Sequence, residues 1–378
     1  MAHAAAVPSI ESLAGMDAKL EALAKFEALA EETETKGARG EANGRLCRAI
    51  EAFRRGDAAQ AAKWALAATT ADPSCAQAFH VLAMALEKMG HVREALATYE
   101  RAFQLDPDDP DLLLDLGLTA WNQNVKAGAE QMFRLYIAAR PDSPLGYNNL
   151  GSIQSDMGDS TMAIETLRSA IMRLPNEAIL WNSLATVLAE DGRVEESLVF
   201  YREAIRLDPA FARFHHNLGY ALAHLGRLAE ALEAYDNAMA LVAEPDERIE
   251  ALHSRAVCLI GMGRLEEGFR EYEIRNNERF RAYVHHMIKA PLWKGESLEG
   301  RRILVTGEQG LGDEIMFADV LPDIQRAVGP KGKLQIAVDP RLVPLFQRSF
   351  PEAEVGTYDD RKLIDKSGNK ELRFVPFA

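Results

Sequence analysis

The sequence predicts a mostly α-helical chain in which an array of stacked helix pairs is followed by a small parallel α/β lobe. Three observations predict this fold. Proline recurs at intervals of 34 residues, at Pro73, Pro107, Pro141, Pro175 and Pro209. Apolar and small residues keep the same phase between these prolines. After residue 300, short apolar runs alternate with helix-like stretches, which is the pattern of a parallel sheet with crossover helices.

Composition and charge limit the classes of function. The chain has 378 residues and a net charge of −14, and the excess acid lies in residues 1–300, because residues 301–378 hold 12 basic and 12 acidic side chains. An acidic surface repels phosphate backbones, so nucleic acid is not an expected partner. The three cysteines are too scattered for a disulfide framework or a zinc site. With neither a secretory signal nor an apolar stretch of membrane-spanning length, we expect a cytoplasmic protein without a membrane span.

The first region, residues 1–41, is predicted to hold an amphipathic helix and a linker. Apolar residues lie three or four apart from Ser9 to Thr35, as on one face of a helix. The glycine-containing stretch from Lys36 to Gly44 predicts a break after it. Two roles are open for this helix: a cap on the first repeat, or a dimerisation helix, since its stripe is nearly heptad-like.

Residues 42–275 are predicted to form about seven helix-pair repeats. The columns that repeat every 34 residues are a large first position (Phe79, Leu113, Tyr147, Trp181), a leucine (Leu82, Leu116, Leu150, Leu184, Leu218) and a small residue (Ala83, Gly117, Gly151, Ala185, Gly219). Gly90, Gly158, Gly192 and Gly226 fall between the two helices of a pair. Each pair hides both of its apolar faces only by stacking on its neighbours, and proline ends the second helix. These columns resemble tetratricopeptide repeat (TPR) proteins, which implies a right-handed superhelical solenoid.

A polar column on the first helices is the predicted peptide-binding site. Asn149, Ser183 and Asn217 precede the repeat leucine, and Asn148 and Asn182 lie one position earlier. First helices line the concave wall of such a solenoid, and an amide side chain can bond the backbone of an extended polypeptide. The column resembles the asparagine ladder of the TPR domain in protein O-linked N-acetylglucosamine transferases. The partner is therefore expected to be a protein or an extended peptide.

Some positions depart from this polar column. Val81 and Asp115 occupy the column in the earlier repeats, so the match to the ladder is partial. His80 and His215 are interpreted as packing or groove residues rather than as metal ligands, and no metal or cofactor is predicted for the chain.

Residues 276–300 are predicted to connect the array to the lobe, residues 301–378. In that lobe an apolar run, Ile303 to Thr306, precedes a glycine loop and a helix, and two further strand-and-helix stretches follow, which indicates a small Rossmann-like sheet. The loop contains Gly307, Gly310, Gly312 and Asp313. Glycines there let backbone amides approach a negatively charged group.

The stretch from Ala290 to about Phe350, with GLGD as its most specific element, is similar to bacterial TPR proteins fused to a two-lobed (GT-B) glycosyltransferase related to the heptosyltransferases. In those relatives the first lobe holds the acceptor and the aspartate that ends the loop is the proposed base, here Asp313. The resemblance implies that TPR repeats recruit a protein acceptor for sugar transfer. Asp313 has a second interpretation as a helix cap, since an acid at a helix start is stabilised by the helix dipole.

The expected lobe is too small to hold a nucleotide sugar as well. The donor lobe of such enzymes needs about 100 residues or more, so we expect no transfer by this chain alone, and a sugar nucleotide only in a longer form. Two alternatives stay open. One is a pure scaffold whose glycine loop has no ligand. The other is a dinucleotide-binding protein, in which Asp339 would take the place of the ribose-binding acid.

Overall fold

The structure, a computed structural model, describes residues 38–277, 279, 291–307, 310–358 and 372–377. The predicted amphipathic helix from Ser9 to Thr35 lies outside these residues. Two compact units are present: one comprises Met1–Ala243 with Val257–Leu265, and the other Glu244–Ala256 with Glu266–Ala378. The predicted limits at residues 41, 275 and 300 stay a prediction.

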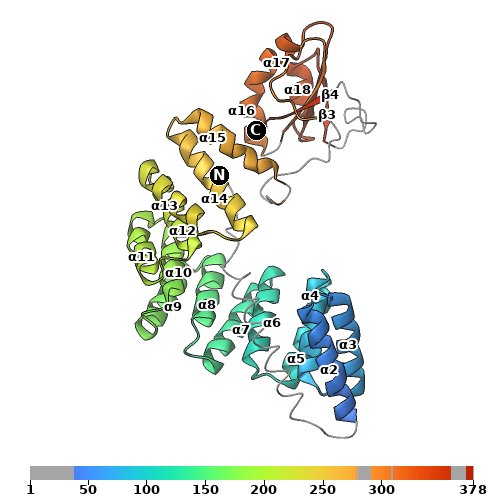
Figure 1. Ribbon diagram of the computed structural model, residues 1–378, viewed down its shortest axis with the longest axis vertical. Helices are drawn as coiled ribbons and strands as arrows, with labels where there is room; N and C mark the ends of the chain where they lie inside the picture. The colour runs from blue at the N-terminus through green and yellow to red at the C-terminus, as the bar shows by residue number, and fades with distance from the viewer. Residues whose placement is uncertain (1–37, 278, 280–290, 308–309, 359–371, 378) are drawn as a thin grey trace. The chain divides into compact units, whose positions relative to one another are not determined.

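Helices occur in consecutive pairs through the first part of the chain (Figure 1). The pairs are α2 (Ala38–Arg54) and α3 (Ala58–Ala71), α4 (Ala76–Lys88) and α5 (Val92–Leu105), α6 (Pro110–Asn122) and α7 (Lys126–Ala139), α8 (Pro144–Asp156) and α9 (Ser160–Arg173), α10 (Ala178–Glu190) and α11 (Val194–Leu207), α12 (Ala212–His224) and α13 (Leu228–Leu241), and α14 (Pro245–Gly261) and α15 (Leu265–Tyr272). A short 3-10 helix, η1 (Glu273–Asn276), follows α15. The mostly α-helical solenoid predicted from the 34-residue period is confirmed.

The five repeated prolines follow the ends of the second helices α3, α5, α7, α9 and α11, as expected. The residue before each proline leaves the helical region; Asp106, for example, has φ −142° and ψ 84°. Its N–H still bonds to the carbonyl of Ala102, so the last turn is closed before the chain departs. The carbonyl of the proline then accepts a bond from the large first position of the next helix: from Tyr147 Oη at 3.0 Å, Trp181 Nε1 at 2.8 Å and His215 Nε2 at 3.0 Å.

The turn inside each pair requires a left-handed residue. Gly90, Gly158 and Gly192 have φ of 84° to 85° there. The pair α6–α7 has Asn124 at this position with φ 61°, and asparagine is among the side chains that best tolerate this region. A glycine missing from the sequence column therefore does not change the turn.

The array core is apolar and closely packed where the two helices of a pair cross. A Cβ on Gly117 would lie 2.6 Å from Phe133 Cε1, and one on Gly151 would lie 2.7 Å from Leu167 Cγ, so the small column is a steric requirement. The core is divided: one cluster extends from Leu46 to Ile153, and a second begins at Ala163 in α9.

The predicted helix break between Lys36 and Gly44 is wrong from Ala38 onward, because α2 begins there. Ala42, Leu46, Ala49 and Ile50 of α2 are buried along one face. Burial of that face outweighs the low helix propensity of the glycines, since propensity is a weak influence beside tertiary packing. A Cβ on Gly44 would meet no atom within 4 Å.

The second unit contains a four-stranded parallel sheet in the order β3-β2-β1-β4. Its elements are β1 (Arg302–Gly307), α16 (Leu311–Phe317), η2 (Ala318–Val320), α17 (Leu321–Val328), β2 (Lys333–Val338), α18 (Val343–Ser349), β3 (Glu354–Thr357) and β4 (Leu372–Phe377). Ile303 and Val305 of β1 pack with Leu321 of α17 and Phe346 of α18 in one core. The small parallel lobe is thus confirmed. Its strand order reverses at β1, where ligands of doubly wound sheets bind.

Gly117→Ala tests the close helix crossing. Because Phe133 is fully buried, we expect its ring to clash with the new methyl group and the free energy of unfolding to fall by about 1–2 kcal/mol. Urea denaturation followed by circular dichroism measures the change. Gly44→Ala is the matched control, and it should be neutral or stabilising by up to about 1 kcal/mol. Equal effects of the two substitutions would contradict the packing argument.

Candidate functional site

The predicted asparagines lie together on the first helices of successive pairs. Asn148 and Asn149 belong to α8, Asn182 to α10 and Asn217 to α12. All four are buried, with between 2% and 8% of their surface exposed. Polar groups at such depth must be hydrogen-bonded or reach water, because burial without a partner is costly.

These side chains bond to one another across the repeat boundaries. Asn217 Nδ2 donates to Asn182 Oδ1 at 3.0 Å, and Ser183 Oγ donates to Asn148 Oδ1; each pair is 35 residues apart. Within α8, Asn148 Nδ2 donates to Asn149 Oδ1 at 3.1 Å. The interval of 35 is one repeat plus one residue, so each bond joins the two neighbouring positions of the predicted column. We call these residues, with Ser183, the polar column.

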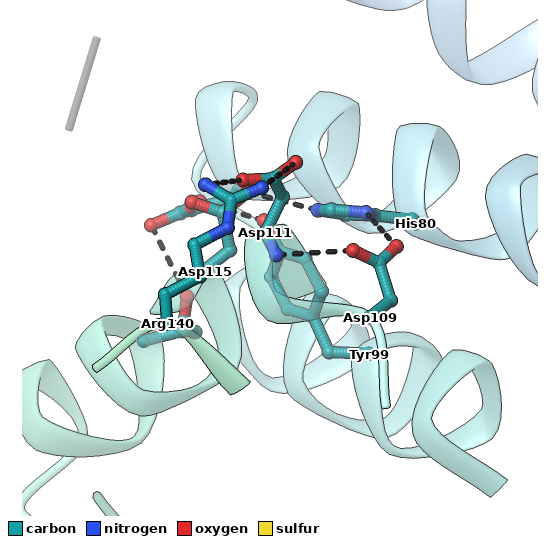
Figure 2. A network of polar contacts seen from close by, with 8 residues as sticks. His80, Tyr99, Asp109, Asp111, Asp115 and Arg140 are labelled. Atoms are coloured by element: carbon teal, nitrogen blue, oxygen red, sulfur yellow. Dashed lines mark hydrogen bonds and ion pairs between the residues drawn. The ribbon is translucent and has the colours of Figure 1, made fainter. Parts of the chain in front are cut away.

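A side-chain contact at the same interval of 35 residues occurs in an earlier repeat, between different residues. His80 Nε2 lies 2.9 Å from Asp115 Oδ2, again 35 residues away, and His80 Nδ1 lies 3.9 Å from Asp109 Oδ2 (Figure 2). Arg140 binds both carboxylate oxygens of Asp111 beside them, at 3.0 and 3.2 Å. Burial raises the pKa of Asp109, and the facing His80 opposes this shift.

Sequence reasoning missed this contact between His80 and Asp115. The sequence indicates a packing or groove residue at His80 and an exception to the asparagine pattern at Asp115. The signal that could have found the pair is positional, since His80 takes the place of Asn148 and Asn182, and Asp115 that of Asn149 and Asn217. Among the described residues, no cluster of three or more His, Cys, Asp and Glu side chains could hold a metal ion.

Three groups of the polar column are not used in these bonds. Asn149 Nδ2, Asn182 Nδ2 and Asn217 Oδ1 have no hydrogen bond to the part of the chain that the structure describes. None of the three is among the buried polar atoms that lack a partner, so each reaches solvent. The column therefore keeps two amide donors and one carbonyl acceptor, on three successive first helices.

The glycine loop of the second unit joins β1 to α16. A Cβ on Gly307 would lie 2.6 Å from Glu314 Cδ, so glycine is required there by the Glu314 carboxyl group. Around Gly312 there is open space, and a Cβ on Gly310 would meet only Asp313 Oδ2, at 3.8 Å. Of the three predicted loop glycines, only Gly307 has a steric reason visible in the described residues.

Glu314 is a functional candidate that sequence reasoning passed over. It is only 1% exposed and accepts bonds from the N–H of Asp339, at 3.0 Å, and from the hydroxyl of Tyr358. Burial raises its pKa; the Asp339 N–H and Arg341 oppose this shift, while the Asp339 carboxylate adds to it. The only hint in the sequence is its place beside Asp313.

The predicted base, Asp313, lies in the first turn of α16 and is partly exposed. Its N–H donates to the carbonyl of Gly310 at 3.0 Å. Asp339 bonds Arg341 through both carboxylate oxygens, at 2.9 and 3.1 Å, and Arg341 lowers its pKa. The acid that a dinucleotide ribose would need is thus already engaged by a cation.

Comparisons with known proteins identify the repeats. Tetratricopeptide repeat family profiles match residues 80–144, 146–176, 185–226 and 212–241, so the chain carries tetratricopeptide repeats. A tetratricopeptide repeat protein from Parabacteroides merdae ATCC 43184 has a similar structure, with a TM-score of 0.50 at 12% identity, covering 63% of this chain and 100% of that one. This likeness concerns the fold alone.

Two curated proteins are similar in sequence. Protein FlbA of Caulobacter vibrioides is 38% identical over 310 residues, which is 82% of this chain and 52% of that protein. The mouse protein O-mannosyl-transferase TMTC1 is 28% identical over 96 residues, covering 24% of this chain and 10% of that protein. The chain thus spans about half of the first and a tenth of the second. None of the described helices has the length and apolar character needed to cross a membrane.

The raised pKa of Glu314 leads us to expect that the stability of the folded lobe depends on pH. The unfolded chain ionises this carboxyl near its ordinary pKa of 4.5, whereas the folded lobe keeps the proton to higher pH. Between these two pKa values the folded state binds more protons than the unfolded state does. The contribution of Glu314 to the free energy of unfolding is therefore fully present below pH 4.5 and is lost as the pH rises through the raised pKa. Glu314→Gln should remove this loss.

The measurement is urea unfolding of the full chain at several values from about pH 5 to about pH 8. Hydrogen–deuterium exchange of peptides from β1 reports the unfolding of the lobe. We expect the stability of the wild type, relative to Glu314→Gln, to decline with rising pH. Parallel curves for the two proteins would contradict the assignment.

Proposed function

We propose that the repeats bind an extended polypeptide along the polar column and present it as the acceptor for sugar transfer at the second unit. Peptide binding is supported by three polar groups that make no hydrogen bond within the polar column. They are Asn149 Nδ2, Asn182 Nδ2 and Asn217 Oδ1, each at the surface of an otherwise buried side chain. Such groups match the alternating N–H and C=O of an extended backbone.

The column binds backbone rather than particular side chains. Its members carry no charge, and their bonds to one another fix the amide orientations before a partner arrives. A preorganised donor loses little entropy on binding, which favours affinity. The expected partner is therefore an unfolded or extended segment of a protein, and sequence preference would come from residues beside the column.

Sugar transfer is supported by the second unit. Its sheet reverses order at β1, the glycine loop follows that strand, and the partly exposed Asp313 lies at the start of α16. A carboxylate in this place could accept the proton of an attacking hydroxyl group. The mouse protein O-mannosyl-transferase TMTC1, which is similar to a 96-residue segment of this chain, belongs by its name to the same class of reaction. We place the reaction in the cytoplasm, with the nucleotide sugar held by a further lobe.

Peptide binding is tested with a random peptide library displayed on phage and selected on the immobilised chain. Calorimetry then compares the selected peptides on the wild type and on Asn149→Ala/Asn217→Ala, for which we expect affinity to fall by about tenfold or more. Asn122→Ala, at the exposed end of α6, is the control and should bind as the wild type does. Equal affinity for all three proteins would rule out the polar column as the peptide-binding site.

The role of Asp313 is tested in the longest form that the gene encodes. With labelled nucleotide sugars and a selected peptide extended by serine and threonine, we expect Asp313→Asn to lower the transfer rate by about 10²-fold or more, because the base is lost. Peptide affinity should stay unchanged. Intact-mass spectrometry detects the product, and transfer at the wild-type rate would leave Asp313 as a helix cap.

A further inference from the structure

The ends of three neighbouring strands meet at one buried side chain. β1 ends at Gly307, whose missing Cβ makes room for the Glu314 carboxyl; β2 is followed by Asp339 and β3 by Tyr358, the two donors to that carboxyl. Both oxygens of Glu314 are used, Oε2 by Asp339 and Oε1 by Tyr358. In a parallel sheet these ends form the edge at which ligands bind.

Asp313 and Glu314 are adjacent in the chain but differ in surroundings. Glu314 is fully buried among the strand ends, while Asp313 is partly exposed. Both N–H groups bond the carbonyl of Gly310, at 3.0 and 3.2 Å, so the two residues share the first turn of α16. Anchoring one of them therefore fixes the place of the other.

We infer that Glu314 is the positioning residue of this site: by joining the ends of β1, β2 and β3, it holds the first turn of α16 and thereby sets where Asp313 lies. The inference rests on the proposed function for its catalytic meaning, since Asp313 is the proposed base. Glu314 itself lies away from solvent and is not expected to touch the acceptor.

A charge is not needed for this role. The carboxyl accepts an N–H from Asp339 and contacts a hydroxyl that can both donate and accept. A glutamine has the same shape, and its carbonyl can accept the N–H while its amide donates to the hydroxyl. Alanine removes both bonds and leaves a gap beside Gly307.

The experiment is hydrogen–deuterium exchange of the full chain with residue-level fragmentation, comparing Glu314→Ala, Glu314→Gln and Asp319→Ala. Asp319 is an exposed acid in η2 and serves as the control. In Glu314→Ala we expect the amides of Asp339 and Asp313 to exchange about tenfold faster or more, with the interior amides of β1 unchanged. In Glu314→Gln and Asp319→Ala they should stay within about threefold of the wild type.

Unchanged exchange at Asp313 in Glu314→Ala would overturn the inference, and so would failure of Glu314→Gln to restore it. Should Glu314→Ala fail to fold, Tyr358→Phe removes one of the two bonds, and an unchanged Asp313 amide there would also overturn it. Sugar transfer is not part of this measurement. A chain that transfers no sugar would refute the proposed function, while the exchange data would still decide whether Glu314 holds the turn.

Discussion

The register at which one helix pair stacks on the next is the constraint on which the array depends. Each pair has two apolar faces, and both are buried only when the neighbouring pairs stack at a defined offset and angle. Side-chain hydrogen bonds help to fix that register: Ser183 donates to Asn148 and Asn217 donates to Asn182, which joins successive first helices at an interval of 35 residues. Within a pair, glycines such as Gly117 let the two helices approach closely. Apolar packing alone is adaptable, whereas a buried hydrogen bond has one satisfied geometry.

The polar column therefore combines a structural role with the binding role proposed for it. Its amides orient one another, and the groups left over point to solvent from fixed positions. A peptide that bonds to them meets donors already held in place. Because the same residues join the repeats, Asn149, whose bond stays within α8, separates the binding role from the stacking role better than Asn182 does.

Much of the fold follows from the sequence because repetition multiplies weak signals. Five prolines at one interval fix the helix ends, and the columns between them fix the buried faces. Two features of the fold were not predicted. The start of α2 was hidden because glycines suggested a break, while packing of Leu46 and Ile50 decided the outcome. Asn124 replaces a column glycine through its tolerance of a left-handed turn.

The site was predicted less completely, for a physical reason. Residue type indicates chemistry, but the partner of a buried polar group comes from another element of the fold. Nothing in the sequence links Glu314 to Tyr358, 44 residues later, and the phase that His80 and Asp115 share with the asparagines indicates a contact only once the 35-residue offset is known. Such pairs depend on strand order and on the repeat offset, and these are known only when the fold is.

The arrangement of the apolar core has a consequence for how substitutions combine. Among the described residues one cluster extends from Leu46 to Ile153 and another from Ala163 to Leu188, although α8 and α9 pack closely, since a Cβ on Gly151 would lie 2.7 Å from Leu167 Cγ. Substitutions far apart change the free energy of unfolding almost additively, whereas residues in contact do not. Loss of volume at Leu46 and at Leu188 would therefore combine as a simple sum, while two losses within one cluster would depend on each other.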